Sequence, residues 1–132
     1  MKYIILLLIL FSVSFAQMKL DEIIKLSNSG QTNLALKEIN SFLDINQNEH
    51  RAYFIKALIL TEKKEFSNAV SILDNAIAIS ETNAEYYRLA GQLNENLNRI
   101  SKAVSSWNNC KKYATGALKG EAEKHLQYLT NE

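Results

Sequence analysis

Residues 51–76, RAYFIKALILTEKKEFSNAVSILDNA, decide the fold, because their pattern recurs in the same chain. Alignment of this segment with residues 85–110 places Tyr53 on Tyr87 and Leu73 on Trp107. Small residues match in the same alignment: Ala57 with Gly91, Ala69 with Ala103, and Ala76 with Cys110. The same spacing toward the N-terminus matches only the second half of the unit, with Ala35 under Ala69 and Ile39 under Leu73. The sequence therefore contains three copies of one unit, of which the first is the weakest.

The apolar residues inside each copy follow a helical period. Ala69, Leu73 and Ala76 recur at steps of three and four residues, which is typical of an amphipathic helix and not of a strand. Polar clusters rich in Asn, Ser and Gly separate the helical segments and predict turns. The predicted fold is all-α, with paired helices at 18–28 and 32–45, 50–62 and 66–79, and 84–96 and 100–113, followed by a capping helix over about 117–130.

The second and third copies resemble the tetratricopeptide repeat (TPR) family. The resemblance rests on Tyr53 and Tyr87 in the first helix of each copy, and on small residues such as Ala57 and Gly91 where two helices approach closely. It implies a right-handed stack of about three antiparallel hairpins, an α-solenoid, over residues 18–45, 50–79 and 84–113. The chain departs from the family in having no proline, and in having Lys19 where the other copies have tyrosine.

Residues 1–16 have the three parts of a secretory signal peptide. Lys2 precedes an apolar run from Ile4 to Ala16, and Ser14 and Ala16 supply the small residues of a cleavage site. We expect cleavage after Ala16, export to the periplasm or beyond the cell, and a repeat domain over 17–132. The alternative is an uncleaved membrane anchor, which would give the protein a membrane partner, although the apolar run is shorter than the roughly 20 residues needed for a spanning helix.

Charge and motifs exclude several functional classes. Without Lys2 the chain carries equal numbers of basic and acidic residues, which gives no reason to expect nucleic acid as a partner. No phosphate-binding loop, nucleophile elbow or metal-binding motif occurs, so we predict no enzyme, no catalytic residue, no metal site and no cofactor. Cys110 aligns with Ala76 and is expected to be a buried thiol, the alternative being a reactive thiol beside Lys111. His50 and His125 are too far apart in sequence to suggest a metal pair.

The resemblance also implies a binding surface. In the family, the first helices of successive hairpins line a concave groove in which a peptide or helix of a partner protein lies. The corresponding residues here are Arg51, Phe54 and Leu58 in the second copy and Arg88, Gln92 and Glu95 in the third. Alternatively, Phe54 and Leu58 pack on neighbouring first helices near Leu20 and Ile24.

The sequence thus predicts a non-catalytic interaction module or scaffold in the cell envelope or secreted space. Its partner would be a protein or peptide. The alternative function is a structural, self-associating subunit of an envelope assembly.

Overall fold

The structure is a computed structural model that describes residues 1–131 and contains seven helices. No strand occurs in this part of the chain. The helices are α1 (Lys2–Asn28), α2 (Thr32–Ile45), α3 (His50–Glu62), α4 (Phe66–Ile79), α5 (Ala84–Asn96), α6 (Ile100–Tyr113) and α7 (Gly116–Thr130).

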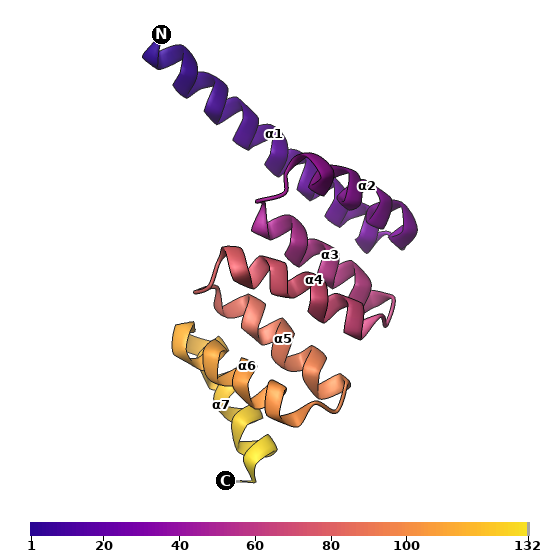
Figure 1. Cartoon of the computed structure of the whole chain (residues 1–132), viewed down its shortest axis with the longest axis vertical. Helices are drawn as coiled ribbons and strands as arrows, with labels where there is room; N and C mark the ends of the chain where they lie inside the picture. Colours follow the sequence, from indigo (N-terminus) through magenta and orange to yellow (C-terminus); the bar gives the residue numbers. More distant parts are fainter. Residues whose placement is uncertain (132) are drawn as a thin grey trace.

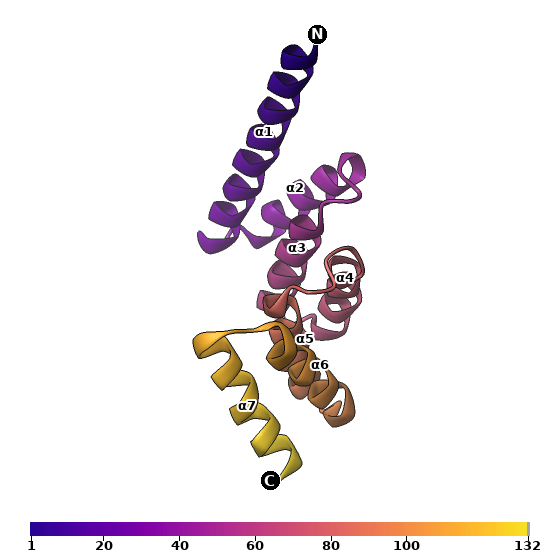
Figure 2. The ribbon, with the colours of Figure 1, turned by 90° about the vertical axis from the view of Figure 1, so that its left-hand side faces the viewer.

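The helices form three stacked hairpins with α7 at the end (Figure 1). Each helix packs mainly on its neighbours in the chain, in the hairpins α1–α2, α3–α4 and α5–α6. The two views together place α1, α3, α5 and α7 toward one side of the stack and α2, α4 and α6 toward the other (Figure 2). This arrangement confirms the predicted all-α repeat fold.

The turn inside each hairpin has the same geometry in all three copies. Gly30, Lys64 and Asn98 occupy equivalent positions in the repeat and have φ values of 82°, 60° and 54°. The backbone N–H of the following residue bonds a carbonyl in the last turn of the preceding helix, as in Glu65 to Leu60 at 2.9 Å. This left-handed cap satisfies carbonyls that the helix end would otherwise leave unpaired. The first copy is therefore a complete structural repeat, although its sequence match is weak.

The turn between hairpins is held by the repeated tyrosines. The hydroxyl of Tyr53 donates to the carbonyl of Gln47 at 2.9 Å, and that of Tyr87 donates to the carbonyl of Glu81 at 2.7 Å. Because the acceptor lies before the start of the helix in both cases, the tyrosine ties its own helix to the end of the preceding hairpin. In the first copy α1 continues without a break through the equivalent position, where Lys19 instead pairs with Glu38 of α2 at 2.9 Å.

In the core of the third hairpin, one larger side chain is accommodated by one smaller residue. Trp107 is fully buried where the second hairpin has Leu73, and Gly91 stands where that hairpin has Ala57. A Cβ atom added at Gly91 would lie 2.6 Å from Cε2 of Trp107, closer than real contacts allow. The missing side chain of Gly91 therefore makes room for the indole.

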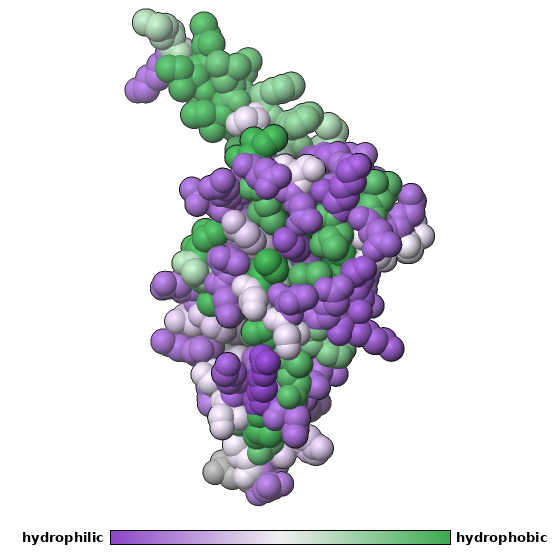
Figure 3. Space-filling view, turned by 45° about the vertical axis from the view of Figure 1, so that its right-hand side comes forward, coloured by the Kyte–Doolittle hydropathy of each residue, from purple (hydrophilic) through white to green (hydrophobic). Residues whose placement is uncertain are grey.

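Helix α1 differs from the sequence prediction at its start. It begins at Lys2 and continues without a break to Asn28, whereas the repeat pattern placed the start near residue 18. Residues 2–16 contain no glycine or proline to interrupt the helix, so the apolar segment and the repeat helix are continuous. This apolar half projects beyond the stack (Figures 1 and 3). By length and composition α1 could cross a membrane, a criterion that signal sequences also meet.

Candidate partner-binding face

The first helices of the hairpins are joined to one another by a series of polar contacts. Arg51 of α3 donates to the side-chain carbonyl of Gln17 in α1, and Ser27 of α1 donates to Glu62 of α3 at 2.8 Å. The next step is between α3 and α5, where His50 Nδ1 and the Tyr86 hydroxyl are 2.6 Å apart. These contacts fix the spacing of the helices that line the predicted groove.

The α3 part of the face is its most apolar part. The ring of Phe54 is half-buried against Tyr86 of α5, with centroids 4.8 Å apart. Leu58, one helical turn further, is 39% exposed, and Arg51 at the start of the helix is exposed. Phe54 thus packs on a neighbouring first helix, as the alternative interpretation expected, but that helix is α5 and not α1. Leu58 remains accessible.

The α5 part of the face carries a charge that is already paired. Arg88 bonds Glu121 of α7 at 2.9 Å and Glu85 at 3.3 Å, and the bond to Glu121 raises the pKa of its guanidinium. Two carboxylates therefore neutralise the cation that the sequence offered as a partner contact. Gln92 is half-buried, and its side-chain amide makes no hydrogen bond to any residue from 1 to 131. Its amide is free to bond a ligand.

Glu95 fastens the last helix to the third hairpin. Its Oε1 accepts hydrogen bonds from Nε1 of Trp107 and from Nδ1 of His125, the latter at 2.7 Å. The imidazole of His125 also stacks on the indole, with ring centroids 4.1 Å apart and planes 16° apart. Glu95 and His125 therefore have a structural role that the repeat pattern did not predict. No motif pointed to it, because the separation of these two residues in the chain does not follow the repeat.

The remaining candidates for chemistry are buried or isolated. Cys110 is fully buried, and burial raises the pKa of its thiol to about 11, which disfavours the reactive thiolate. The described residues contain no group of three His, Cys, Asp or Glu side chains that could hold a metal ion.

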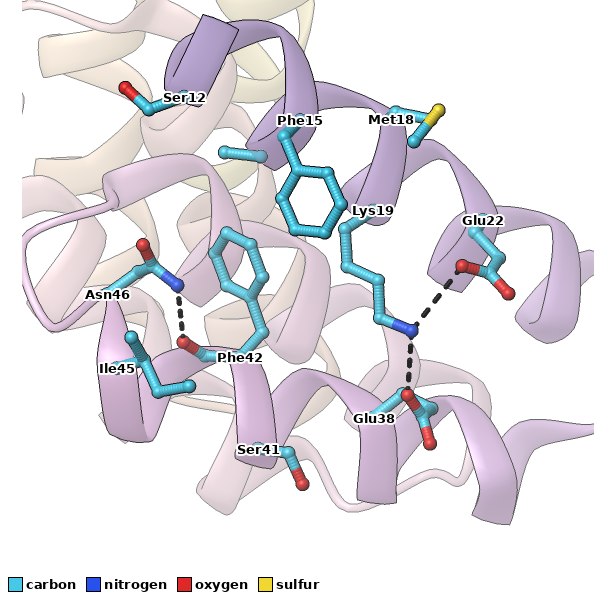
Figure 4. A pocket seen from close by; sticks show the side chains of 11 residues that line it. Ser12, Phe15, Met18, Lys19, Glu22, Glu38, Ser41, Phe42, Ile45 and Asn46 are labelled. Atoms are coloured by element: carbon cyan, nitrogen blue, oxygen red, sulfur yellow. Dashed lines mark hydrogen bonds and ion pairs between the residues drawn. The ribbon is translucent and has the colours of Figure 1, made fainter. Parts of the chain in front are cut away.

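Among the hollows of the described residues, two lie at opposite ends of the stack. One, of about 380 Å³, adjoins the face at α7 and is lined by Ala117, Gly120, Glu121, Lys124 and His125. The other, of about 530 Å³, lies between α1 and α2 (Figure 4), and its lining includes neither Leu58 nor Gln92. The face between them offers an apolar side chain, a free amide and a half-buried ring, which can hold a ligand.

Comparison with known proteins identifies the fold. No protein-family model and no curated sequence matches the chain. Solved structures do match. The type III secretion chaperone SycD of Yersinia enterocolitica, in complex with a peptide of the translocator YopD, has a TM-score of 0.82 at 9% identity, over 89% of this chain and 94% of that one.

Two further structures show the same similarity. PcrH, in complex with the chaperone-binding region of PopD, has a TM-score of 0.82 at 12% identity, covering 89% of this chain and 92% of its own. The first TPR domain of Spaghetti (RPAP3), bound to an HSP90 peptide, has a TM-score of 0.78 at 15% identity, covering 88% of this chain and 90% of its own. The chain has the tetratricopeptide fold, as its repeat pattern predicted.

Proposed function

We propose that this protein is a non-catalytic module that binds a segment of another protein on the face formed by α3 and α5. The observation that carries the proposal is Leu58, an apolar side chain 39% exposed on the side of the stack where the first helices lie. An exposed leucine beside a half-buried aromatic ring suits the apolar anchor of a peptide or helix. Structurally similar proteins that hold partner peptides support this proposal.

The side chains of the face that are not already bonded within the chain indicate what kind of partner segment would fit. Leu58 and the half-buried ring of Phe54 would receive an apolar side chain, and Gln92 would bond a backbone or side-chain polar group nearby. Arg88 contributes little net charge because Glu85 and Glu121 already pair with it. A partner segment with an apolar anchor and few charges fits this face better than an acidic one.

The proposed place of action is the periplasm or the exterior of the cell, after removal of residues 1–16. The support is the apolar segment of residues 4–16 with Ser14 and Ala16 before the proposed cut. Intact-mass measurement of the exported protein tests this: the proposal requires a chain that starts at Gln17, and a chain that retains Met1 contradicts it.

The binding proposal is tested by capture and substitution. The mature protein, crosslinked in envelope extract of its source, should retain a specific protein, from which overlapping peptides define the bound segment. Leu58→Glu should weaken that segment's binding by at least about tenfold, because it places a charge at the anchor position. Leu34→Glu is the matched control, since Leu34 is 41% exposed but lies on α2. Equal effects of both substitutions, or no effect of the first, would disprove the assigned face.

A further inference from the structure

The second and third hairpins differ at one buried position of their first helices. Leu60 of α3 and Asn94 of α5 are equivalent in the repeat, and they are 5% and 4% exposed. The amide nitrogen of Asn94 donates to the carbonyl of Ala90 at 2.8 Å, but its Oδ1 has no hydrogen-bond partner among residues 1–131. A buried acceptor without a partner lowers stability, and a leucine at this position would avoid that cost. Packing of the third hairpin therefore does not explain the asparagine.

Asn94 lines a hollow of about 320 Å³ between α4 and α6. Tyr87, Ala90 and Asn94 follow one another on one face of α5 and form the floor of this hollow. Its volume is at the lower end of the range of small-molecule pockets. The hollow belongs to the side of the second helices, and its lining contains neither Leu58 nor Gln92.

The lining of the hollow is smaller and more polar than the equivalent positions one repeat earlier. Three positions show this: Ala90 replaces Lys56, Asn94 replaces Leu60 and Ser106 replaces Ile72. Two further positions add charge of opposite sign, because Asp74 and Lys102 stand where the previous repeat has Asn40 and Asn68. The hollow between α4 and α6 is therefore chemically distinct within the repeat.

The polar groups around the hollow are not engaged within the described chain. Asp74 of α4 and Lys102 of α6 form no ion pair with any of residues 1–131. The partial burial of Asp74 raises the pKa of its carboxyl, and the positive charge of Lys102 opposes this shift. The side chains of Ser105 and Asn109, also on α6, form no hydrogen bond within the same part of the chain. An acceptor side and a donor side are thus both available to a ligand.

We propose that this hollow binds a free amino acid or another small zwitterion. The ammonium group of such a ligand has three N–H donors, which serve Oδ1 of Asn94 and the carboxylate of Asp74. The carboxylate of the ligand accepts a charge-assisted hydrogen bond from Lys102. A simple cation leaves Lys102 opposed to it, and a simple anion leaves Asp74 opposed to it, so the hollow selects a ligand with both charges. This site goes beyond the proposed function.

NMR titration of the isotope-labelled full chain with the common amino acids tests the proposal. Methylammonium and acetate are the control probes, because each carries only one of the two charged groups. At least one amino acid should shift the side-chain amide of Asn94 saturably, with a dissociation constant below about 1 mM. Both control probes should bind at least about tenfold more weakly, since each lacks one charge-assisted contact.

Asn94→Leu should weaken amino-acid binding by at least about tenfold, because it removes the buried acceptor. For this variant, shifts of the backbone amides of Ala90 and Asp74 report binding. Asn96→Leu is the matched control: Asn96 lies on the same helix and donates to the carbonyl of Gln92 at 2.9 Å, but it is exposed and outside the lining. Its substitution should leave the affinity unchanged. Circular dichroism checks that both variants are folded.

Asp74→Asn and Lys102→Asn keep the test decisive if Asn94→Leu does not fold. Each installs the residue found one repeat earlier at an exposed position, and each should weaken the binding of the amino acid.

Four outcomes would overturn the proposal. These are the absence of saturable shifts at Asn94 with every amino acid, equally tight binding of methylammonium or acetate, undiminished affinity in Asp74→Asn and Lys102→Asn, or an equal loss in Asn96→Leu. Failure here leaves the proposed function untouched, because binding of the partner segment is measured at Leu58, outside this lining.

Discussion

The second and third hairpins have the same backbone fold but differ in the contacts that their side chains make. In the second, Ala57 and Leu73 form a purely apolar seam, and its first helix leaves Leu58 accessible. In the third, Gly91 admits the indole of Trp107, whose Nε1 joins Glu95 in the network that holds α7. The third hairpin thus uses its polar side chains to end the stack. The second keeps its exposed face free, and that face is where we place partner binding.

The largest expected effect comes from replacing Trp107 of the third hairpin with leucine, the residue that the second hairpin has at the equivalent position 73. Trp107→Leu should lower the free energy of unfolding by about 3 kcal/mol, because it leaves a cavity beside Gly91 and removes one donor to Glu95. Urea denaturation monitored by circular dichroism measures the loss. A loss no greater than that of a surface control such as Leu34→Ala would contradict the accommodation of Trp107 by Gly91.

Gly91→Ala tests the same packing of Gly91 against Trp107 from the other residue. Helix propensity alone would favour alanine by about 1 kcal/mol. We nevertheless expect a loss of about 2 kcal/mol, because the added Cβ collides with Trp107. In the Trp107→Leu background the same change should be neutral or stabilising, since it recreates the pair Ala57 and Leu73. A double-mutant cycle with additive effects would mean that the two positions do not compensate each other.

Removal of the imidazole tests the attachment of the last helix. His125→Ala should cost about 1.5 kcal/mol, because it removes the bond to Glu95 and the stacking on Trp107. Hydrogen exchange should become faster throughout α7. His50→Ala is the control: it removes a bond to Tyr86 between α3 and α5 and should leave exchange in α7 unchanged. Unchanged exchange in α7 of the His125 variant would refute the role of the network.

A smaller effect is expected at Arg88. Arg88→Gln should lower stability by no more than about 1 kcal/mol, since the side chain is partly exposed and its ion pairs are screened by water. The loss should shrink in high salt, and binding of the partner segment should change by less than about tenfold. Arg51→Gln, which removes no ion pair in the described chain, should show little salt dependence. A large loss of affinity in the Arg88 variant would show that Arg88 contacts the partner directly.

The smallest effect comes from the turns inside the hairpins. Lys64→Gly should raise stability by about 0.7 kcal/mol, because glycine tolerates the positive φ of this position. Gly30→Ala should do the opposite in the first hairpin, where an added Cβ meets no atom within 4 Å and only the backbone conformation is strained. Thermal unfolding that moves in the same direction for both variants would contradict the shared turn geometry.

The repeat fold was predictable from the sequence because it depends on periodic residues. Tyr53, Ala57 and Leu73 recur at a constant spacing, and burial of the matching positions follows from that period. The positive φ at Lys64 was not predictable, since lysine rarely adopts it and only the closure of the hairpin imposes it. The start of α1 was missed because helix continuity through an apolar segment leaves no repeat signal.

The candidate site was only partly predictable for a related reason. The resemblance correctly indicated which helices are neighbours, but not which of their side chains are already engaged. Arg88 and Glu95 are both bonded to α7, which lies outside the repeat and whose contacts no alignment of the copies could reveal. Leu58 and Gln92 keep accessible groups, so they carry the proposal while the charged residues do not.

NMR mapping of a bound partner segment on the mature protein is the most direct test of whether partners bind on the α3–α5 face. Titration of the captured peptide should shift the methyl resonances of Leu58 and the side-chain amide of Gln92. The methyl resonances of Leu34 and Ile100, on α2 and α6, should stay in place. Shifts concentrated on Leu34 and Ile100, with Leu58 and Gln92 unaffected, would show that the partner does not bind on the α3–α5 face and would place its binding on the opposite side of the stack.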